Sequence, residues 1–442
     1  MARQPRADDL FRPIGAIQGA YRYLFAGRDS VVRDILGSFE LSGAVPIIYG
    51  ERGVGKTSVA WRAFEVLRDK DTDAAAVDVA SEFELDDHYI PLWVECGDWF
   101  AGIESALLAL LMPKGLRQAV TIVDLFPDLL SEEARIKAST SFELNLAVFK
   151  AKADLSRSER KGAIEKAFEN YTDRALDNPI EMFSQLCGKL IEKYSSSTVV
   201  VFIDEFDRLP DKSMVGSILK TLTGIRFVII GVATSSDDLI GSHPSVDRKL
   251  SKVYVPPFRY EEAAEIFENA SQASLEYAGS NGISFTEPFV RQVFEETGGY
   301  PNLIQKVGYY AIQPRRLNKT MFDRPVIVDL PDYKPAVRAM FKHGQRSGDS
   351  EGEIEFKIAS SVGDSTRRMA IIRKLAAYGT GWMNVSDLSA ALGRDDRQQL
   401  QGNLDRFVDE GVLHRNQETE EVAFSSPVHL MAARLFVEAR SN

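Results

Sequence analysis

Five short apolar stretches recur in the first 255 residues, each bounded by glycine or polar residues. They are Ala44 to Tyr49, Tyr89 to Cys96, Thr198 to Ile203, Arg226 to Ala233 and Lys252 to Val255. Such runs are typical of strands buried on both faces, and the segments between them carry helical spacing. This alternation predicts an α/β fold, a parallel five-stranded sheet with helices on both faces. We assign residues 21–257 to this core and residues 1–20 to an N-terminal tail.

The interval between the second and third stretches is longer than one crossover helix requires. It includes residues 102–177, much of which is charged, with good helix formers and few large apolar residues. We interpret residues 102–177 as a mostly helical insertion. The sequence leaves open whether this insertion is a solvated surface or a contact surface. Asn178 and Pro179 then begin an amphipathic helix that leads into the third strand.

The pattern becomes purely helical after Pro256 and Pro257. Three helices are expected there: Tyr260 to Tyr277, Glu287 to Thr297 and Pro301 to Ile312. They predict a compact helical domain over residues 258–312. Residues 313–363 contain several prolines and a polar stretch, which favour a linker or partly ordered connector.

The last segment, residues 364–442, predicts three helices, a strand pair within Val412 to Phe424 and a final helix. Three helices followed by a hairpin make a winged helix-turn-helix domain. DNA contact would need exposed Arg, Lys, Asn or Gln on the third helix. That helix also carries acidic residues, and the proposed wing, His414 to Glu421, ends in acidic residues that would repel phosphates. DNA binding and a packing or protein-contact role therefore both stay open.

The overall charge limits the classes of partner. The formal net charge is -11, so the whole chain has no basic footprint for nucleic acid or an anionic membrane. Cys96 and Cys187 are too far apart to suggest a disulfide framework or a metal-ligand spacing. No apolar stretch reaches the roughly 18 residues of a membrane span, and the N-terminus lacks an apolar signal core. These features indicate a soluble, cytoplasmic protein.

A glycine-rich turn follows the first apolar stretch. It reads Gly50, Glu51, Arg52, Gly53, Val54, Gly55, Lys56, Thr57 and Ser58. Its first eight residues match G-x-x-x-x-G-K-[ST] between a strand and a helix, where this pattern has meaning. Glycines let backbone N–H groups approach phosphates closely, and the helix N-terminus adds positive partial charge. Lys56 would supply a cation and the Thr57 hydroxyl would ligate Mg²⁺. The turn therefore predicts a site for ATP with Mg²⁺.

Two carboxylates, Asp204 and Glu205, directly follow the third apolar stretch. Two adjacent acids at the end of a fully apolar strand are costly to bury. Alone they could merely open a turn, but a phosphate-binding turn in the same chain favours a catalytic role. Asp204 would orient the Mg²⁺ or its waters, and Glu205 would polarise the attacking water as general base. We therefore assign Lys56, Asp204 and Glu205 as catalytic residues, with Thr57 and Asp204 as metal ligands.

These two motifs resemble the Walker A and Walker B elements of AAA+ and STAND-type ATPases. The likeness is to the branch of Orc/Cdc6-like and archaeal-type STAND proteins, and it spans Tyr21 to Ile312. The resemblance implies that Gly27 and Arg28 belong to an element that lies along the adenine. It also implies that Thr234 is a γ-phosphate sensor and that Arg248 is an arginine finger. Pro301 corresponds to a proline that packs near the nucleotide from the helical lid.

The chain departs from many AAA+ proteins in one respect, because its Gly298 to Pro301 element contains no second sensor arginine. A proline there fits a STAND-like switch, in which the nucleotide holds the lid closed. We therefore expect a slow Mg-dependent ATPase whose nucleotide state controls assembly, as a homo-oligomer, or a partner protein. Two alternatives stay open: an initiator-like or transposition-helper ATPase that binds DNA, and a nucleotide-bound scaffold in a bacterial defence or signalling complex.

Overall fold

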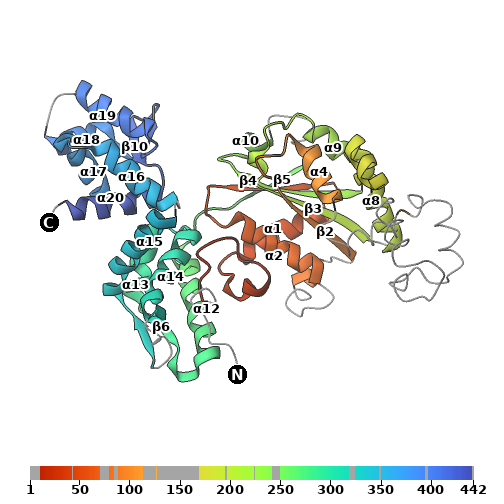
Figure 1. Cartoon of the computed structure of the whole chain (residues 1–442), viewed down its shortest axis with the longest axis horizontal. Coiled ribbons are helices and arrows are strands. Elements are labelled where there is room, and N and C mark those ends of the chain that lie inside the picture. Colours follow the sequence, from red (N-terminus) through yellow and green to blue (C-terminus); the bar gives the residue numbers. More distant parts are fainter. Residues whose placement is uncertain are drawn as a thin grey trace, which may run out of the picture. The chain divides into compact units, whose positions relative to one another are not determined.

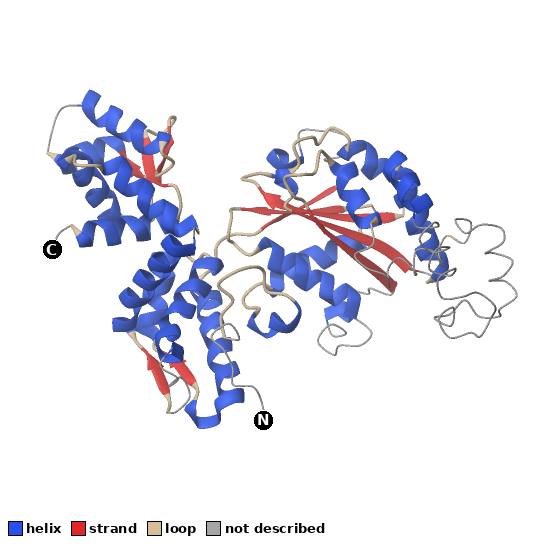
Figure 2. Cartoon of the chain, in the orientation of Figure 1, coloured by secondary structure: helices blue, strands red, loops and turns tan. Residues whose placement is uncertain are grey.

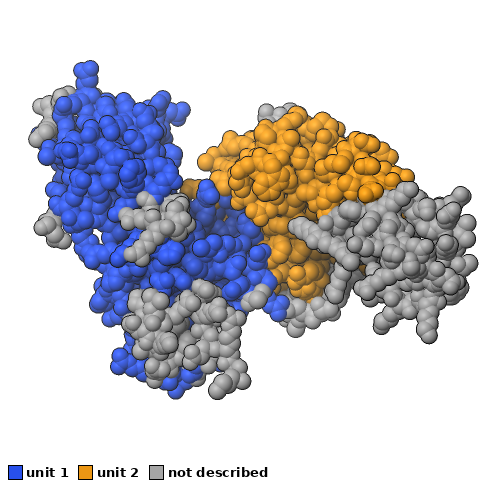
Figure 3. Space-filling model, in the orientation of Figure 1, with its two compact units in different colours: residues 1–29, 52–58, 256–442 blue, residues 30–51, 59–255 orange. Residues whose placement is uncertain are grey.

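The computed structural model describes residues 10–41, 43–69, 79–83, 88–112, 126, 169–194, 197–222, 224–240, 249–317, 324–347, 350–393 and 397–440 (Figure 1). The chain forms two compact units (Figure 3). The sheet unit comprises residues 30–51 and 59–255. The helical unit comprises residues 1–29, 52–58 and 256–442.

The described part of the sheet unit contains five parallel strands, which confirms the predicted fold class (Figure 2). They are β1 (Val45–Gly50), β2 (His88–Glu95), β3 (Ser197–Asp204), β4 (Ile225–Val232) and β5 (Leu250–Tyr254). Their order across the sheet is β2-β3-β4-β1-β5. β1 therefore lies between β4 and β5, and its last residue, Gly50, pairs with Val232 at the end of β4. The carboxyl ends of β1, β3 and β4 consequently meet at one edge of the sheet.

Helices cover both faces of this sheet (Figure 1). On one face, α4 (Ile103–Leu111) packs on β2 and α8 (Pro179–Lys193) packs on β3. On the other face, Trp61 and Phe64 of α2 (Lys56–Asp69) contact Trp93 of β2, with ring centroids 4.4 and 5.9 Å away. Side chains alternate across a strand, so β3 must be apolar on both faces, as its sequence predicts. The unit also contains α1 (Asp29–Gly37), η3 (Ser38–Glu40), η6 (Phe206–Arg208), α9 (Val215–Thr221) and α10 (Ser236–Ile240).

The helical unit contains the three helices predicted after β5. Its first elements are η2 (Gly19–Leu24), α12 (Tyr260–Ala278), η7 (Gly279–Asn281), β6 (Ile283–Phe285), α13 (Glu287–Thr297), α14 (Pro301–Leu317), β7 (Val326–Val328) and η8 (Leu330–Asp332). Strands β6 and β7 pair in parallel. Phe267, Phe289 and Ile304 of the three long helices are buried in one core. We call α12, α13 and α14 the lid.

The structure differs from the irregular connector that we expected over residues 313–363. This region contains α15 (Tyr333–Ser347) and α16 (Ser350–Val362), and Phe341 and Ile358 are buried in the core of the lid. The prolines that suggested a connector misled the prediction because Pro331 and Pro335 stand at the starts of η8 and α15. A proline in the first turn of a helix removes no helical hydrogen bond.

The segment expected as an N-terminal tail also differs from the prediction. Leu10 and Phe11 are fully buried in the core of the lid. A Cβ atom added at Gly308 would lie 2.3 Å from the Phe11 ring, so the absence of a side chain on α14 makes room for this phenylalanine. Residues 10–18 are therefore part of the packed helical unit.

The C-terminal segment, residues 364–442, follows the predicted order of helices and hairpin within its described part. Its elements are α17 (Thr366–Tyr378), β8 (Met383–Asn384), α18 (Val385–Leu392), α19 (Arg397–Asp409), β9 (Leu413–Asn416), β10 (Glu421–Phe424) and α20 (Pro427–Ala439). The three strands form an antiparallel sheet of order β8-β10-β9. Helix α20 packs on both α16 and α17, which joins this segment to the helices before it.

Most of the insertion predicted over residues 102–177 lies outside the described residues, which include α4 and a helical stretch from residue 169. Across the described ranges, no helix combines the length and apolar character needed to cross a membrane.

Candidate functional site

The glycine-rich turn connects β1 with α2, as the sequence predicts. Gly50, Gly53 and Gly55 have φ angles of 151°, 85° and 96°, a region of backbone space that favours glycine. Lys56 is the first residue of α2, and only 8% of it is exposed. These glycines leave the backbone of the turn accessible next to the N-terminus of α2 and a buried lysine, as a phosphate-binding turn requires. These residues fit a nucleotide phosphate.

Residues 52–58 of this turn belong to the helical unit, where they contact the lid. The Asn302 N–H group donates a hydrogen bond to the Gly53 carbonyl oxygen at 3.4 Å. A Cβ atom added at Gly55 would lie 3.9 Å from Cγ of Pro301. The Ile17 N–H group donates to Oγ of Ser58 at 3.0 Å. The structure thus brings Pro301 beside the glycine turn, where the resemblance places a proline near the nucleotide.

A glycine pair before α14 makes this approach possible. Gly298 and Gly299 have φ angles of 60° and 76°, and the Phe258 N–H group donates to the Gly299 carbonyl oxygen at 2.8 Å. A Cβ atom at Gly299 would lie 2.3 Å from the Phe258 carbonyl oxygen. Real Cβ atoms do not come this close to backbone, so only glycine fits. The pair fixes the start of α14 against the segment that follows β5.

We expect Gly299→Ala to lower the free energy of unfolding of the helical unit by about 3 kcal/mol, because it adds a backbone clash to the strain of a positive φ. Gly411→Ala is the matched control. Gly411 has a φ of 72° and no atom within 4 Å of an added Cβ, so it should lose only about 1 kcal/mol. Denaturant unfolding followed by circular dichroism measures both. Equal losses would show that the contact with Phe258 is unimportant.

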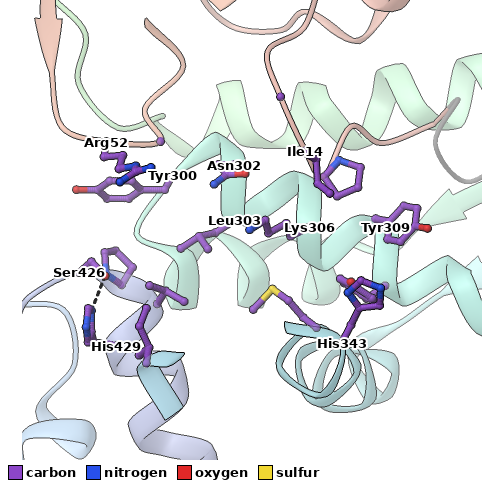
Figure 4. Close-up of a pocket in the computed structure, with 18 residues that line it drawn as sticks. Ile14, Arg52, Tyr300, Asn302, Leu303, Lys306, Tyr309, His343, Ser426 and His429 are labelled. Atoms are coloured by element: carbon purple, nitrogen blue, oxygen red, sulfur yellow. Dashed lines mark hydrogen bonds between the residues drawn. The ribbon is translucent and has the colours of Figure 1, made fainter. Parts of the chain in front are cut away.

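A cavity of about 770 Å³ lies between the glycine turn, the lid and the C-terminal segment, all within the helical unit (Figure 4). Arg52 of the glycine turn and Tyr300 before α14 both line it, and Ser426 and His429 contribute from the start of α20. Lys306 of α14 also lines it. Among the described residues that line this cavity there is no Asp or Glu, although the chain as a whole is acidic. The cavity therefore suits an anionic ligand better than a cationic one.

His429 contributes to this cavity as a neutral side chain. Burial, together with the positive charge of Lys357, lowers the pKa of its imidazole to about 4. Its Nδ1 atom lies 2.8 Å from Oγ of Ser426, the residue before α20 (Figure 4). A neutral imidazole can donate one hydrogen bond and accept another, so His429 can present an N–H group without adding a charge.

The acidic pair lies in the sheet unit, at the end of β3. Asp204 is 4% exposed, and its Oδ1 atom accepts the N–H group of Glu205 at 2.9 Å. Glu205 has a φ of 54°, and 40% of its side chain is exposed. This left-handed conformation is uncommon for a residue other than glycine and turns the chain sharply after the strand. One carboxylate is thus buried at the strand end, and the next reaches solvent.

The surroundings of the pair include residues that sequence reasoning missed. Arg208 forms an ion pair with Asp98, which follows β2, at 2.9 Å, and its Nη1 atom lies 4.0 Å from Oε2 of Glu205. The Cys96 N–H group donates to the Asp204 carbonyl oxygen at 2.9 Å. Burial, followed by the charge of Asp204, raises the pKa of the Cys96 thiol to about 12. This cysteine is therefore a packing residue rather than a nucleophile.

Gly27 and Arg28 bind the beginning of the lid. Gly27 has a φ of 66°, and its N–H group donates to Oε2 of Glu265 on α12 at 3.0 Å. Arg28 is 3% exposed; it donates to the Pro256 carbonyl oxygen and stacks 4.4 Å above the Phe258 ring. Burial lowers the pKa of the Arg28 guanidinium, and the negative charge of Glu262 partly offsets this lowering. These contacts hold the segment between β5 and α12, and the adenine contact implied by the resemblance stays a prediction.

Of the two residues predicted as γ-phosphate sensor and arginine finger, the structure describes Thr234 but not Arg248. Thr234 follows β4 by two residues, and its hydroxyl donates to Oδ2 of Asp238 at 2.7 Å. This bond, with a second one from Ser235, lowers the pKa of the Asp238 carboxyl group. Thr234 therefore contributes to the N-terminus of α10 in this structure, and a sensor role stays a prediction. Arg248 lies outside the described residues.

The chain has an α/β fold in which a glycine-rich turn joins β1 to α2, the strand–turn–helix arrangement in which phosphate-binding loops occur. Similar solved structures include the Walker-type ATPase PABY2304 of Pyrococcus abyssi, at 14% identity and a TM-score of 0.45, over 96% of this chain and 99% of that one. Another is the Aeropyrum pernix Orc2 protein in ADPNP–ADP complexes, at 14% identity and a TM-score of 0.45, over 94% of each chain. A third is the Aeropyrum pernix Orc1 protein in complex with DNA, at 13% identity and a TM-score of 0.42, over 95% of each chain. No protein-family model matches the sequence, and no curated protein matches it.

Proposed function

We propose that this protein binds ATP with Mg²⁺ and hydrolyses it slowly. The observation that carries the proposal is the glycine turn directly after β1, whose three positive φ angles and buried Lys56 would suit a phosphate group. Thr57 and Asp204 would hold the Mg²⁺, which when bound neutralises charge on the phosphates. Lys56 would bind phosphate oxygens, and Glu205 would accept the proton of the attacking water.

The division of labour between the two acids follows from their environments. Asp204 is buried and accepts a backbone hydrogen bond, so its carboxylate has a fixed orientation suited to a metal ion or its waters. Glu205 is partly exposed, so its carboxylate can reach a water molecule. The two residues share the sheet edge with Gly50, since β4 pairs with both β3 and β1. This shared edge supports a common site for the nucleotide and the general base.

We further propose that the nucleotide acts as a switch that holds the lid and the C-terminal segment. Residues 52–58 contact Pro301 and Asn302, and the same turn lines the cavity that Ser426 and His429 complete. A phosphate bound at the turn would therefore alter the surroundings of both α14 and α20. Through these contacts the nucleotide state would control assembly or access of a partner protein.

The switch predicts slower amide hydrogen exchange when Mg-ATP is added, in residues 298–305 and 426–430. The reason is that bound phosphate would stabilise the turn against α14 and the start of α20. Exchange measured by mass spectrometry should slow in the wild type and stay unchanged in Lys56→Ala. Unchanged exchange in both proteins, at an ATP concentration that saturates the wild type, would contradict the switch while leaving ATP binding intact.

A further inference from the structure

The Asp207 carboxylate occupies an unusual position at the end of β4. Its Oδ1 atom accepts the backbone N–H group of Val232, the last residue of that strand, at 2.7 Å. Asp207 belongs to η6, the turn that follows Glu205, and Val232 is 25 residues further along the chain. One side chain therefore connects the turn of the proposed general base to the neighbouring strand.

This hydrogen bond extends the sheet beyond the end of β3. The paired residues of β3 and β4 end at Ile203 and Ile229, so no backbone of β3 lies opposite Val232. The next N–H group, that of Ala233, points the other way and donates to the Gly50 carbonyl oxygen at 3.4 Å. Because successive N–H groups of a strand point to opposite neighbours, the Val232 N–H group faces the β3 side. The Asp207 carboxylate takes the place of the missing strand carbonyl.

Gly231 supplies an independent sign that this approach is close. A Cβ atom added there would lie 2.9 Å from Oδ1 of Asp207 and 2.5 Å from Cδ1 of Leu239. A side chain at residue 231 would therefore push the carboxylate away from β4. The φ angle of Gly231 is not in the left-handed region, so the need for glycine here comes from space and not from backbone conformation.

The same turn is also fixed on its other side. Arg208 pairs with Asp98, which follows β2, so the turn after β3 is tied to the ends of both neighbouring strands. Glu205 needs such support because its left-handed backbone is strained for a residue other than glycine. We infer that Asp207 is a positioning residue, which holds the Glu205 carboxylate in register with Gly50 and Thr234 through the end of β4. This inference rests on the proposed ATPase function, in which Glu205 is the general base.

The test compares Asp207→Ala with Asp207→Asn. Asparagine keeps an Oδ1 acceptor for Val232, whereas alanine does not. We expect Asp207→Ala to lower kcat for ATP roughly 10- to 100-fold with a nearly unchanged KM, because a displaced base slows chemistry but not binding. Asp207→Asn should stay within about threefold of the wild type by the same reasoning. Val232 is 36% exposed, so water can replace the lost bond and the variant should fold.

Asp211→Ala is the matched control, because the Asp211 carboxylate accepts the Ser213 N–H group within the loop after η6 at 2.9 Å. It should leave kcat unchanged. Gly231→Ala is a second variant, expected to lower kcat as Asp207→Ala does. Amide exchange at Val232 is read in the same proteins without ATP, and it should speed up in Asp207→Ala but not in Asp207→Asn.

Unchanged kcat and unchanged Val232 exchange in Asp207→Ala would overturn the inference. Absence of phosphate release by the wild type would instead refute the proposed function, and the Val232 exchange would still report on the contact.

Discussion

Lys56→Ala is expected to weaken ATP binding about 100-fold or more, which corresponds to about 3 kcal/mol. Lys56 is 8% exposed at the first position of α2, so its ammonium group can meet phosphate oxygens with little competition from water. Alanine keeps the helix and removes the charge. Isothermal titration with Mg-ATP measures the change in Kd, and circular dichroism checks that the variant is folded.

The matched control is Lys342→Ala, which removes a lysine from an exposed position on α15. Its Kd for Mg-ATP should equal that of the wild type. If Lys56→Ala bound ATP as tightly as the Lys342→Ala protein, the glycine turn would not be the phosphate site. The proposed assignment of Gly50 to Ser58 would then be wrong.

Glu205→Gln is expected to lower the rate of phosphate release by about 10²- to 10⁴-fold while leaving the Kd for ATP nearly unchanged. Glutamine has the size and hydrogen-bonding reach of glutamate but cannot accept the proton of the attacking water. The Glu205 side chain is 40% exposed, so this substitution should not disturb the core. Single-turnover hydrolysis and a separate binding titration distinguish a loss of chemistry from a loss of binding.

Glu95→Gln is the control for that prediction. Glu95 ends β2, opposite Asp204 in the strand register, and its side chain is exposed. The variant removes a carboxylate from the same sheet edge without touching the proposed base, so its rate should stay close to that of the wild type. A comparable loss in both variants would point to the local negative charge rather than to general base catalysis by Glu205.

The sequence predicts the sheet and the glycine turn well because their signals are local. A strand buried on both faces must be apolar throughout, and β3 shows this directly in Val199 to Ile203. The turn needs glycine where φ is positive, and Gly50, Gly53 and Gly55 stand at those positions. In both cases the local backbone or the burial of a short segment determines which residue type can stand at a position.

Contacts between distant residues could not be predicted in the same way. Arg208 and Asp98 are 110 residues apart, and either could be an ordinary surface charge. Asp207 likewise looks like one more acid in a turn until β4 is placed beside it. The fold of residues 333–362 was missed because polar positions outnumber the few apolar residues that bury, such as Phe341 and Ile358. Tertiary packing determines these features, and neighbouring residues in the sequence give no sign of it.

Arg28 has a structural role that the sequence did not predict, beside the ligand contact that stays a prediction. The resemblance implied contact with an adenine. The structure buries its guanidinium against Pro256 and Phe258, with Glu262 as its ionic partner at 3.9 Å. A buried arginine needs such partners, because an unpaired charge in the interior is costly. Arg28 therefore stabilises the start of the lid, whatever further contact it makes with a ligand.

Phosphate release at saturating Mg-ATP, measured side by side for the wild type and Glu205→Gln, decides whether the glycine turn and the Asp204–Glu205 pair act on the same Mg-ATP. We expect steady phosphate release by the wild type, no release after EDTA is added, and a rate at least about 100-fold lower in the variant. Equal rates in the two proteins, or no release by a wild type that binds ATP, would contradict this expectation.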